Sequence, residues 1–463
     1  MARGNNAFVD SDWSEAMKCY WQAAKNCADL RPFIENNLYI ARGRWLKERH
    51  AGLQRGDALR LGVSCWDLAR NPAGRALTLA EAWKPLVPEV KIIGSIFENF
   101  GLEPWPPIQS SEVVLNYFIC QKQSLFLQQA MELVVANPLD VLHVSKPRLP
   151  SLIFAWLYEQ VWGARILLDI DDEEMGFISS NSDKKNLTEF NRLSSRYWTQ
   201  WSIDHLQGLQ LRTVSNVALQ QRYHGTMLPH VRPVSRFSPS EKFSREMRRY
   251  WQIPESARVV LFSGTPRQHK GLMETAKIIS ALEDPNLWLV IAGDFPPKLE
   301  SMKEELKAIT GLQVRFLPGH SYNRIAEVVA IGDITLLLQD PDSLISQFQL
   351  PAKLMDALAM GLTVLATPTK PLQPFIEADV VTPVSEADVA QKLQNVLYSD
   401  LQVQARRNRA YFMSELSVES KQDTMKDLLD ELLAGKPKTI SWEGQLDLMI
   451  NHPLEWLNQR SHF

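Results

Sequence analysis

The sequence contains few cysteines, and their spacing does not indicate disulfides or zinc. The four are Cys19, Cys27, Cys65 and Cys120, and none belongs to a CxxC pair. Disulfide scaffolds and structural zinc sites need more cysteines at closer spacing. We therefore expect a reducing compartment and predict a cytoplasmic protein without a metal site.

Long apolar runs are also missing. No uninterrupted run approaches the roughly 20 residues that a membrane span needs, and the first residues lack the apolar core of a signal peptide. The most apolar stretch, 149–170, contains Glu159 and Arg165, so we interpret it as a helix followed by a buried strand. We predict no transmembrane segment and leave peripheral membrane contact open.

An excess of positive charge is likewise absent. The formal net charge is -3 and the isoelectric point about 6.3, which argues against nucleic acid as a partner. The chain has 463 residues, 45% of them hydrophobic, more than one ordinary core accommodates. We therefore expect at least two domains.

Short apolar runs alternate with helical stretches from about residue 58, as in parallel sheets with crossover helices. We predict strands at 59–66, 90–96, 113–118, 140–145, 164–170, 211–215, 258–264, 287–294, 312–319, 334–339 and 362–367. A basic stretch at 238–251 separates two sets. The predicted fold class is α/β, with two Rossmann-like doubly wound domains, 56–240 and 241–435, facing across a cleft that holds the active site.

Helices are expected at both ends of the chain. Residues 1–55 resemble about one and a half tetratricopeptide units, and a plain helical extension explains the pattern equally well. Because such units need neighbours, residues 1–50 should pack on the next domain, on a second copy or on a partner protein. The tail 436–463 carries two tryptophans and is predicted to dock on the body as a helix.

The segment 263–282 predicts an anion site. A strand ends at Ser263 and Gly264, a short loop contributes Arg267 and Lys270, and a helix begins after Gly271. Helix-start N–H groups and basic side chains bind phosphates together. A basic turn with solvated side chains is the alternative.

A second informative segment covers 346–367. An apolar helix from residue 352 carries Lys353 and Asp356, three apart and near one face, and ends at Gly361. Asp356 is suited to ribose hydroxyls and Lys353 to phosphates. A surface ion pair is the alternative.

Taken in order, these segments resemble the C-terminal domain of the family 4 (group 1) retaining glycosyltransferases of the two-Rossmann-domain type, over about 256–400. The resemblance implies Arg267 and Lys270 as the basic pair on the donor diphosphate, with catalytic importance, and Asp356 as the ribose carboxylate. It implies these further donor-binding residues: Gly264, Thr265, Gly271, Gln349, Leu350, Pro351, Lys353 and Gly74. Two positions depart from the family pattern, since Phe348 replaces the first motif carboxylate and Thr265 the arginine after the glycine.

The N-terminal half resembles the same family more loosely. Asn71, Gly74 and Arg75 stand where relatives have a glycine-rich loop that faces the donor phosphates or the acceptor, and Asn71 is expected on the acceptor side. Asp171 and Asp172 replace a His-Asp pair and are expected to meet the reacting sugar. Asp169 and Asp171 also spell a D-x-D, a metal-binding pattern that belongs to a different glycosyltransferase fold, and carboxylates at a helix start are the plain alternative.

Two more basic residues follow the strand at 140–145. Lys146 and Arg148 lie just beyond its end and are candidates for binding an acidic acceptor group. His143, inside that strand, is interpreted as a core histidine rather than a base. His230 lies between the two domains and is given a hinge role.

The predicted function is transfer of a sugar from a nucleotide diphosphate sugar to a hydroxyl of a glycan, lipid-linked or protein acceptor, with retention. The nucleotide sugar is a co-substrate, and neither a cofactor nor a metal is expected. A catalytically inactive protein that recruits partners through its N-terminal helices, and a sugar-nucleotide epimerase, are the alternatives.

Overall fold

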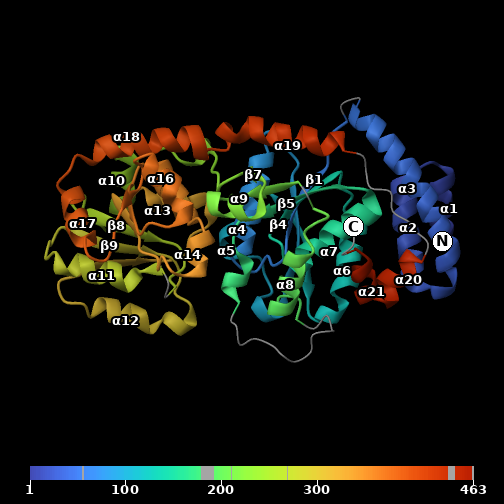
Figure 1. Cartoon of the computed structure of the whole chain (residues 1–463), viewed down its shortest axis with the longest axis horizontal. Helices are drawn as coiled ribbons and strands as arrows, with labels where there is room; N and C mark the ends of the chain where they lie inside the picture. Colours follow the sequence, from blue (N-terminus) through green and yellow to red (C-terminus); the bar gives the residue numbers. More distant parts are fainter. Residues whose placement is uncertain (55–56, 179–191, 210, 268–269, 436–443, 461–463) are drawn as a thin grey trace.

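The computed structural model describes residues 1–54, 57–178, 192–209, 211–267, 270–435 and 444–460. Two parallel sheets, each covered by helices, lie side by side along the long axis of the molecule, and three helices stand at its N-terminal end (Figure 1). The chain therefore has the predicted α/β architecture of two facing Rossmann-like domains.

The first sheet has seven strands in the order β3-β2-β1-β4-β5-β6-β7. Its strands are β1 Leu61–Cys65, β2 Lys91–Phe97, β3 Val114–Cys120, β4 Val141–Ser145, β5 Arg165–Ile170, β6 Arg212–Val214 and β7 Thr226–Met227. The helices between them are α4 Pro72–Trp83, α5 Pro106–Gln109, α6 Phe126–Ala136, α7 Leu149–Trp162, α8 Arg196–Asp204 and α9 Val217–Tyr223. The central strand β1 is buried along its whole length, as expected for a parallel strand covered on both faces.

The second sheet has six strands in the order β10-β9-β8-β11-β12-β13. They are β8 Arg258–Ser263, β9 Leu287–Ala292, β10 Gln313–Leu317, β11 Ile334–Leu337, β12 Thr363–Ala366 and β13 Thr382–Pro383. The helices are α10 Glu241–Tyr250, α11 Leu272–Ala281, α12 Ser301–Lys307, α13 Ile325–Val329, α14 Leu344–Phe348, α15 Ala352–Met360, α16 Gln373–Glu377, α17 Val389–Leu397 and α18 Leu401–Tyr411. Helix α15 ends at Gly361, whose left-handed backbone (φ 77°) caps it as predicted.

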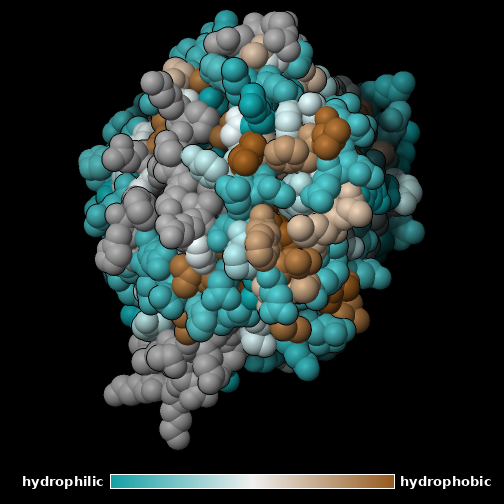
Figure 2. Space-filling view, turned by 90° about the vertical axis from the view of Figure 1, so that its right-hand side faces the viewer, coloured by the Kyte–Doolittle hydropathy of each residue, from teal (hydrophilic) through white to brown (hydrophobic). Residues whose placement is uncertain are grey.

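The N-terminal helices pack on the first domain. They are α1 Ala2–Val9, α2 Trp13–Asn26 and α3 Arg31–Gln54, and α2 contacts α6 while α3 contacts α7. Tyr20, Trp21 and Trp45 are buried in one cluster with Trp162 of α7. The outer side keeps Phe33 and Ile40 exposed, and Figure 2, which views the molecule from this end, shows apolar groups among polar ones. Of the three packing surfaces predicted for residues 1–50, this structure has the segment on the next domain.

The chain crosses between the domains twice. The first crossing follows β7. The second follows α18, where a π-helical turn (Phe412–Leu416) leads to α19 Gln422–Ala434. The crossings lie side by side, because Arg232 N–H donates to the Leu416 carbonyl (3.0 Å) and Val418 N–H to the Arg232 carbonyl (2.9 Å). Helix α19 then runs along the first domain (Figure 1).

The C-terminal boundary therefore differs from the predicted one. We expected 241–435 to form one domain, but Met425, Leu428 and Leu432 of α19 are buried in the core of the first sheet. The amphipathic spacing of these residues predicts a helix without showing which domain it covers. The tail helix α20 Gln445–Asn451 docks on α3 and α6, and α21 Pro453–Arg460 packs on α20 with Trp456 and Leu457 in the core cluster of the first domain. Residues 436–443 of the predicted tail lie outside the described part.

Of the helices in the described ranges, none combines the length and apolar character that a membrane span requires.

Candidate active site

The carboxyl ends of both sheets face each other between the domains. Lys146 follows β4, Asp171 and Asp172 follow β5, and Gly264 follows β8. Contacts join the two sides directly. The Gln349 side chain donates to Asp172 Oδ1 (2.9 Å), and Asn216 Nδ2 donates to the Phe348 carbonyl (2.8 Å). Residues predicted from separate motifs thus meet at one interface.

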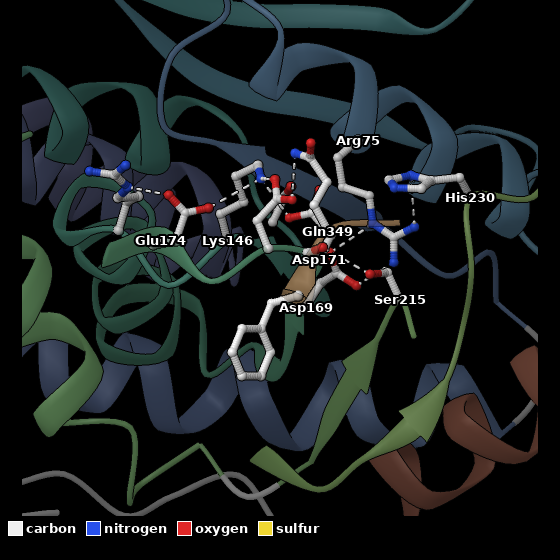
Figure 3. Close-up of polar contacts among 12 residues, drawn as sticks. Arg75, Lys146, Asp169, Asp171, Glu174, Ser215, His230 and Gln349 are labelled. Carbon is white, nitrogen blue, oxygen red and sulfur yellow. Dashed lines mark hydrogen bonds and ion pairs between the residues drawn. The ribbon is translucent and has the colours of Figure 1, made fainter. Parts of the chain in front are cut away.

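On the first-domain side, Lys146 is surrounded by carboxylates. Its Nζ lies 2.6 Å from Asp171 Oδ1, 2.6 Å from Asp172 Oδ2 and 3.1 Å from Glu174 Oε1, and Figure 3 shows Lys146 between Glu174 and Asp171. Burial opposes the charged form, but these three carboxylates raise the pKa of Lys146 well above its ordinary value. The backbone of Lys146 is left-handed (φ 68°), a conformation that costs a non-glycine residue about 1 kcal/mol or more. The ion pairs offset this strain.

Among the described residues, the same three carboxylates are the group that could hold a metal ion, because their oxygen atoms lie within 4.8 Å of one another. The Lys146 ammonium already supplies positive charge among them. The two carboxylates of the D-x-D pattern do not act as a pair, because Asp169 binds Arg75 whereas Asp171 binds Lys146.

Arg148 completes this cluster. Its Nε lies 2.5 Å from Glu174 Oε2 and its Nη1 donates to Thr199 Oγ1 (2.8 Å). Lys146 and Arg148 are both about 6% exposed. Their two charges face three carboxylates of the protein, which leaves no excess positive charge for an acidic acceptor group.

Asp171 has the most perturbed carboxyl group of the cluster. Burial raises its pKa to about 7, with Asp172 and Asp169 adding to the rise and Lys146 and Arg75 opposing it. A carboxyl group with this pKa exchanges protons near neutral pH, which suits acid–base work.

Behind this cluster a buried network anchors the linker between the domains. Arg75 forms a bidentate pair with Asp169 (2.9 and 2.7 Å) and donates to the carbonyls of Leu228 and Pro229 (2.8 and 2.9 Å). Its Nη1 also lies 3.5 Å from His230 Nδ1. Arg75, which the sequence places in the phosphate-facing loop, is therefore fully engaged with the protein.

His143 orders the same network from the core side. Trp83 Nε1 donates to His143 Nδ1 (3.0 Å), so His143 Nε2 carries the proton that faces Thr213 Oγ1 (3.0 Å). Thr213 in turn donates to Asp169 Oδ1 (2.7 Å). Burial lowers the pKa of His143 to about 4, consistent with the predicted core histidine.

The second domain contributes the loop between β8 and α11. Gly264 has φ 103°, and the left-handed Gly271 (φ 64°) precedes the helix. A Cβ at Gly271 would lie 2.2 Å from the Leu338 carbonyl oxygen, so only glycine fits. Lys270 Nζ donates to the Thr265 carbonyl (2.9 Å), and Arg267 is exposed. Residues 268–269 of this loop lie outside the described residues.

Lys270 and Lys353 are close enough to influence each other. The Lys353 Nζ lies 4.0 Å from the centre of the Phe262 ring. Burial, followed by the charge of Lys270, lowers the pKa of Lys353 to about 7, and burial and Arg267 lower that of Lys270 to about 8. Within the described ranges neither lysine has a carboxylate partner. The arrangement favours an incoming anion.

Asp356, predicted on the ribose, forms an ion pair across the domains. Arg232 Nε donates to its Oδ1 (2.7 Å), and both side chains are buried. Lys353 and Asp356 thus share a helix without pairing with each other. The pairing spans 124 positions, and no local pattern in the sequence indicates it.

The remaining predicted residues lie around the same interface. Leu350 is buried, its backbone hydrogen-bonds with His230, and Pro351 is the N-cap of α15. Asn71 is exposed at the start of α4. Gly74 lies in its first turn, where a Cβ would approach Trp105 to 3.2 Å.

Residues 243–411 match the family model of glycosyl transferases group 1, which covers most of the second domain. A search of curated proteins finds no match to the chain. Solved structures are similar over most of their length. HepE from Anabaena, in complex with UDP and glucose, is 13% identical, with 80% of this chain and 99% of that chain covered and a TM-score of 0.59.

Two further structures agree. Sucrose-phosphate synthase from Thermosynechococcus elongatus is 14% identical, with 81% and 100% covered and a TM-score of 0.59. A glycosyltransferase from Rickettsia africae is 14% identical, with 82% and 100% covered and a TM-score of 0.59. Identities this low establish the fold. The chain thus has the two-domain fold of these glycosyltransferases, and its residues 243–411 match the glycosyl transferases group 1 family.

Proposed function

We propose that the protein transfers a sugar from a nucleotide diphosphate sugar to an acceptor hydroxyl. The observation that carries this proposal is the pair Lys270 and Lys353, two lysines without carboxylate partners in the described ranges. Lys270 precedes α11 and Lys353 lies in the first turn of α15, in a domain that matches group 1 glycosyl transferases. HepE, of the same fold, binds UDP-glucose.

In this proposal the donor diphosphate lies between Lys270, Lys353 and Arg267. The N–H groups at the start of α11 add hydrogen bonds, and Gly264 and Thr265 let the phosphates approach the backbone. Gln349, Leu350 and Pro351 position the donor from the loop before α15. Asp356 stays our candidate for the ribose, since Arg232 hydrogen-bonds only one of its carboxylate oxygens.

On the acceptor side, Asp171 and Asp172 meet the reacting sugar and the acceptor hydroxyl, with Asn71 and Gly74 at the edge of the site. Asp171, whose pKa of about 7 leaves it partly protonated near neutral pH, contacts the sugar hydroxyls, and the acceptor proton goes to the departing diphosphate. Lys146 and Arg148 orient these carboxylates rather than bind an acidic acceptor. The acceptor is a glycan, a lipid-linked sugar or a protein.

We further propose retention without an obligatory metal. Lys270, Lys353 and Arg267 stabilise the departing diphosphate, which is the largest expected catalytic contribution. The diphosphate itself accepts the acceptor proton, as in the family 4 enzymes that the sequence resembles. The ammonium of Lys146 supplies the charge among Asp171, Asp172 and Glu174 that a divalent ion would otherwise provide. We also retain the cytoplasmic location and the tetratricopeptide likeness of the N-terminal helices as proposals.

Calorimetric titration with UDP-, GDP- and ADP-sugars tests the donor site. At least one should bind, and Lys270→Ala and Arg267→Ala should each weaken it by about 1.5–3 kcal/mol, the range for a hydrogen bond to a charged group. Equal affinities in wild type and variants would refute the assignment. Product formation from the bound donor then separates a transferase from an inactive binding protein.

A further inference from the structure

A second group of basic side chains lies at the amino ends of the strands of the first sheet, on the side away from the cleft. Arg49 belongs to α3, Arg60 precedes β1, and Arg165 begins β5. Because the strands are parallel, the starts of β1 and β5 lie at the edge remote from their carboxyl ends. This group therefore shares no residue with the proposed transferase site.

One carboxylate stands at the centre of this group. Arg49 holds Asp140 in a bidentate contact (2.7 and 2.6 Å), and Arg60 donates its backbone N–H to the same carboxylate (2.8 Å). Asp57 is near enough to affect Arg49. Three guanidinium groups thus face two carboxylates, and the excess charge is positive.

Two of the three guanidinium groups keep free donors. The Arg60 guanidinium lies 5.2 Å from the centre of the Trp45 ring, and no side-chain hydrogen bond holds it in the described ranges. Arg165 uses Nε for the Gly435 carbonyl (3.1 Å), and among the described residues no side-chain partner is found for its two terminal nitrogens. Burial lowers the pKa of both arginines, as expected for partly desolvated cations whose charge is incompletely balanced.

A cavity of about 20 Å³ opens between these elements. It is lined by Arg49, Arg165 and Asp140 and walled by the indoles of Trp45 and Trp162, whose rings meet edge to face at 5.3 Å. The volume admits one water-sized group. A ligand therefore places one oxygen atom inside and the rest of its head group at the mouth.

We propose that this cavity binds a phosphate group, carried by inorganic phosphate or by a phosphomonoester, with Arg49, Arg60 and Arg165 as its ligands. Guanidinium groups suit this ligand, because their paired N–H donors match the oxygens of phosphate. One oxygen enters the cavity between Arg49 and Arg165, and the others face Arg60, which lies outside the lining and beside the ring of Trp45. Because α3 supplies Arg49 and Trp45, bound phosphate fastens the N-terminal helices to the first domain. The inference does not rest on the transferase activity.

Calorimetric titration of the full chain with sodium phosphate, against sodium chloride of equal ionic strength, tests the site. Phosphate also has affinity for the donor site, so Lys270→Ala is titrated in parallel. Wild type and Lys270→Ala should show a common saturable site, and Arg60→Gln with Arg165→Gln should weaken it at least tenfold. Arg258→Gln, at an exposed arginine elsewhere, is the matched control and should bind as wild type.

The single variant Arg60→Gln controls for misfolding of the double variant, because it removes only the contact with Trp45. It should also weaken phosphate binding, while its melting temperature stays within about 2 °C of wild type. Glycerol 3-phosphate distinguishes the sources. Tighter binding than inorganic phosphate identifies a phosphomonoester, equal or weaker binding identifies free phosphate, and both support the site. Loss of all saturable phosphate binding in Lys270→Ala, or wild-type affinity in the double arginine variant, would overturn the proposal.

Discussion

Lys270 and Lys353 lie close together without a carboxylate partner in the described ranges, and their lowered pKa values of about 8 and about 7 predict that donor binding takes up protons. At pH 7.5 roughly three quarters of Lys270 and roughly one quarter of Lys353 are protonated, from those pKa values and the titration of independent groups. A bound diphosphate stabilises both charged forms. Binding should then take up about one proton, so affinity falls by up to about tenfold per pH unit near pH 7.5 and becomes nearly pH-independent below pH 6.

Calorimetry in buffers of different ionisation enthalpy measures this uptake. The ligand is a nucleotide sugar, because its diphosphate has no group that titrates between pH 6 and 9. Lys353→Met should reduce uptake at pH 7.5 to about a quarter of a proton, the part contributed by Lys270. Lys277→Met, at an exposed lysine of α11, should leave it unchanged. If the binding enthalpy did not depend on the buffer, or if Lys353→Met took up as many protons as wild type, the two lysines would not form the donor anion site.

Four further outcomes are expected. Arg75→Leu should lower the free energy of unfolding by about 3–5 kcal/mol, because it leaves Asp169 buried and unpaired, and denaturant unfolding measures it; a loss below 1 kcal/mol would contradict the network. Asp356→Asn should weaken nucleotide binding and also reduce stability, by about 3 kcal/mol, because Arg232 loses its buried partner; unchanged stability would argue against that pairing. Turnover should survive EDTA, and restoration of lost activity by manganese would instead make Asp171, Asp172 and Glu174 a metal site. Deletion of residues 1–50 should uncover Trp162 and cause aggregation or a change in mass, which light scattering measures. Nucleotide affinity should stay within about twofold of wild type (less than ~0.5 kcal/mol). A soluble fragment that kept its oligomeric state but no longer bound the nucleotide would place the segment in the active site.

The strands were predictable because each is a short apolar run between polar turns. The exceptions, β7 and β13, have two residues each, too few for a pattern to emerge. The backbone of the loop between β8 and α11 was predictable for a similar reason, since Gly264, Lys270 and Gly271 are local in sequence. A glycine before a helix and a basic residue beside it indicate this loop geometry without knowledge of the rest of the fold.

The partners of the charged residues were not predictable. Lys146 meets Glu174 across 28 positions, and Arg75 meets Asp169 across 94. Neighbouring strands of a parallel sheet bring such residues together, so the strand order is needed first. One signal was available for the contacts of Lys146. Basic residues follow the strand at 140–145 and four acidic residues follow the strand at 164–170, and these strands, β4 and β5, are adjacent in the sheet.

The paired crossings between the domains also define how the chain divides. Arg232 and Ser417 form a bridge, so the second domain leaves and re-enters the first at neighbouring points. It is an insertion, and the first domain is a discontinuous unit closed by α19. We therefore expect that a few residues joining the two points can replace the insertion, whereas ending the chain anywhere before α19 would remove Met425, Leu428 and Leu432 from the core of the first domain.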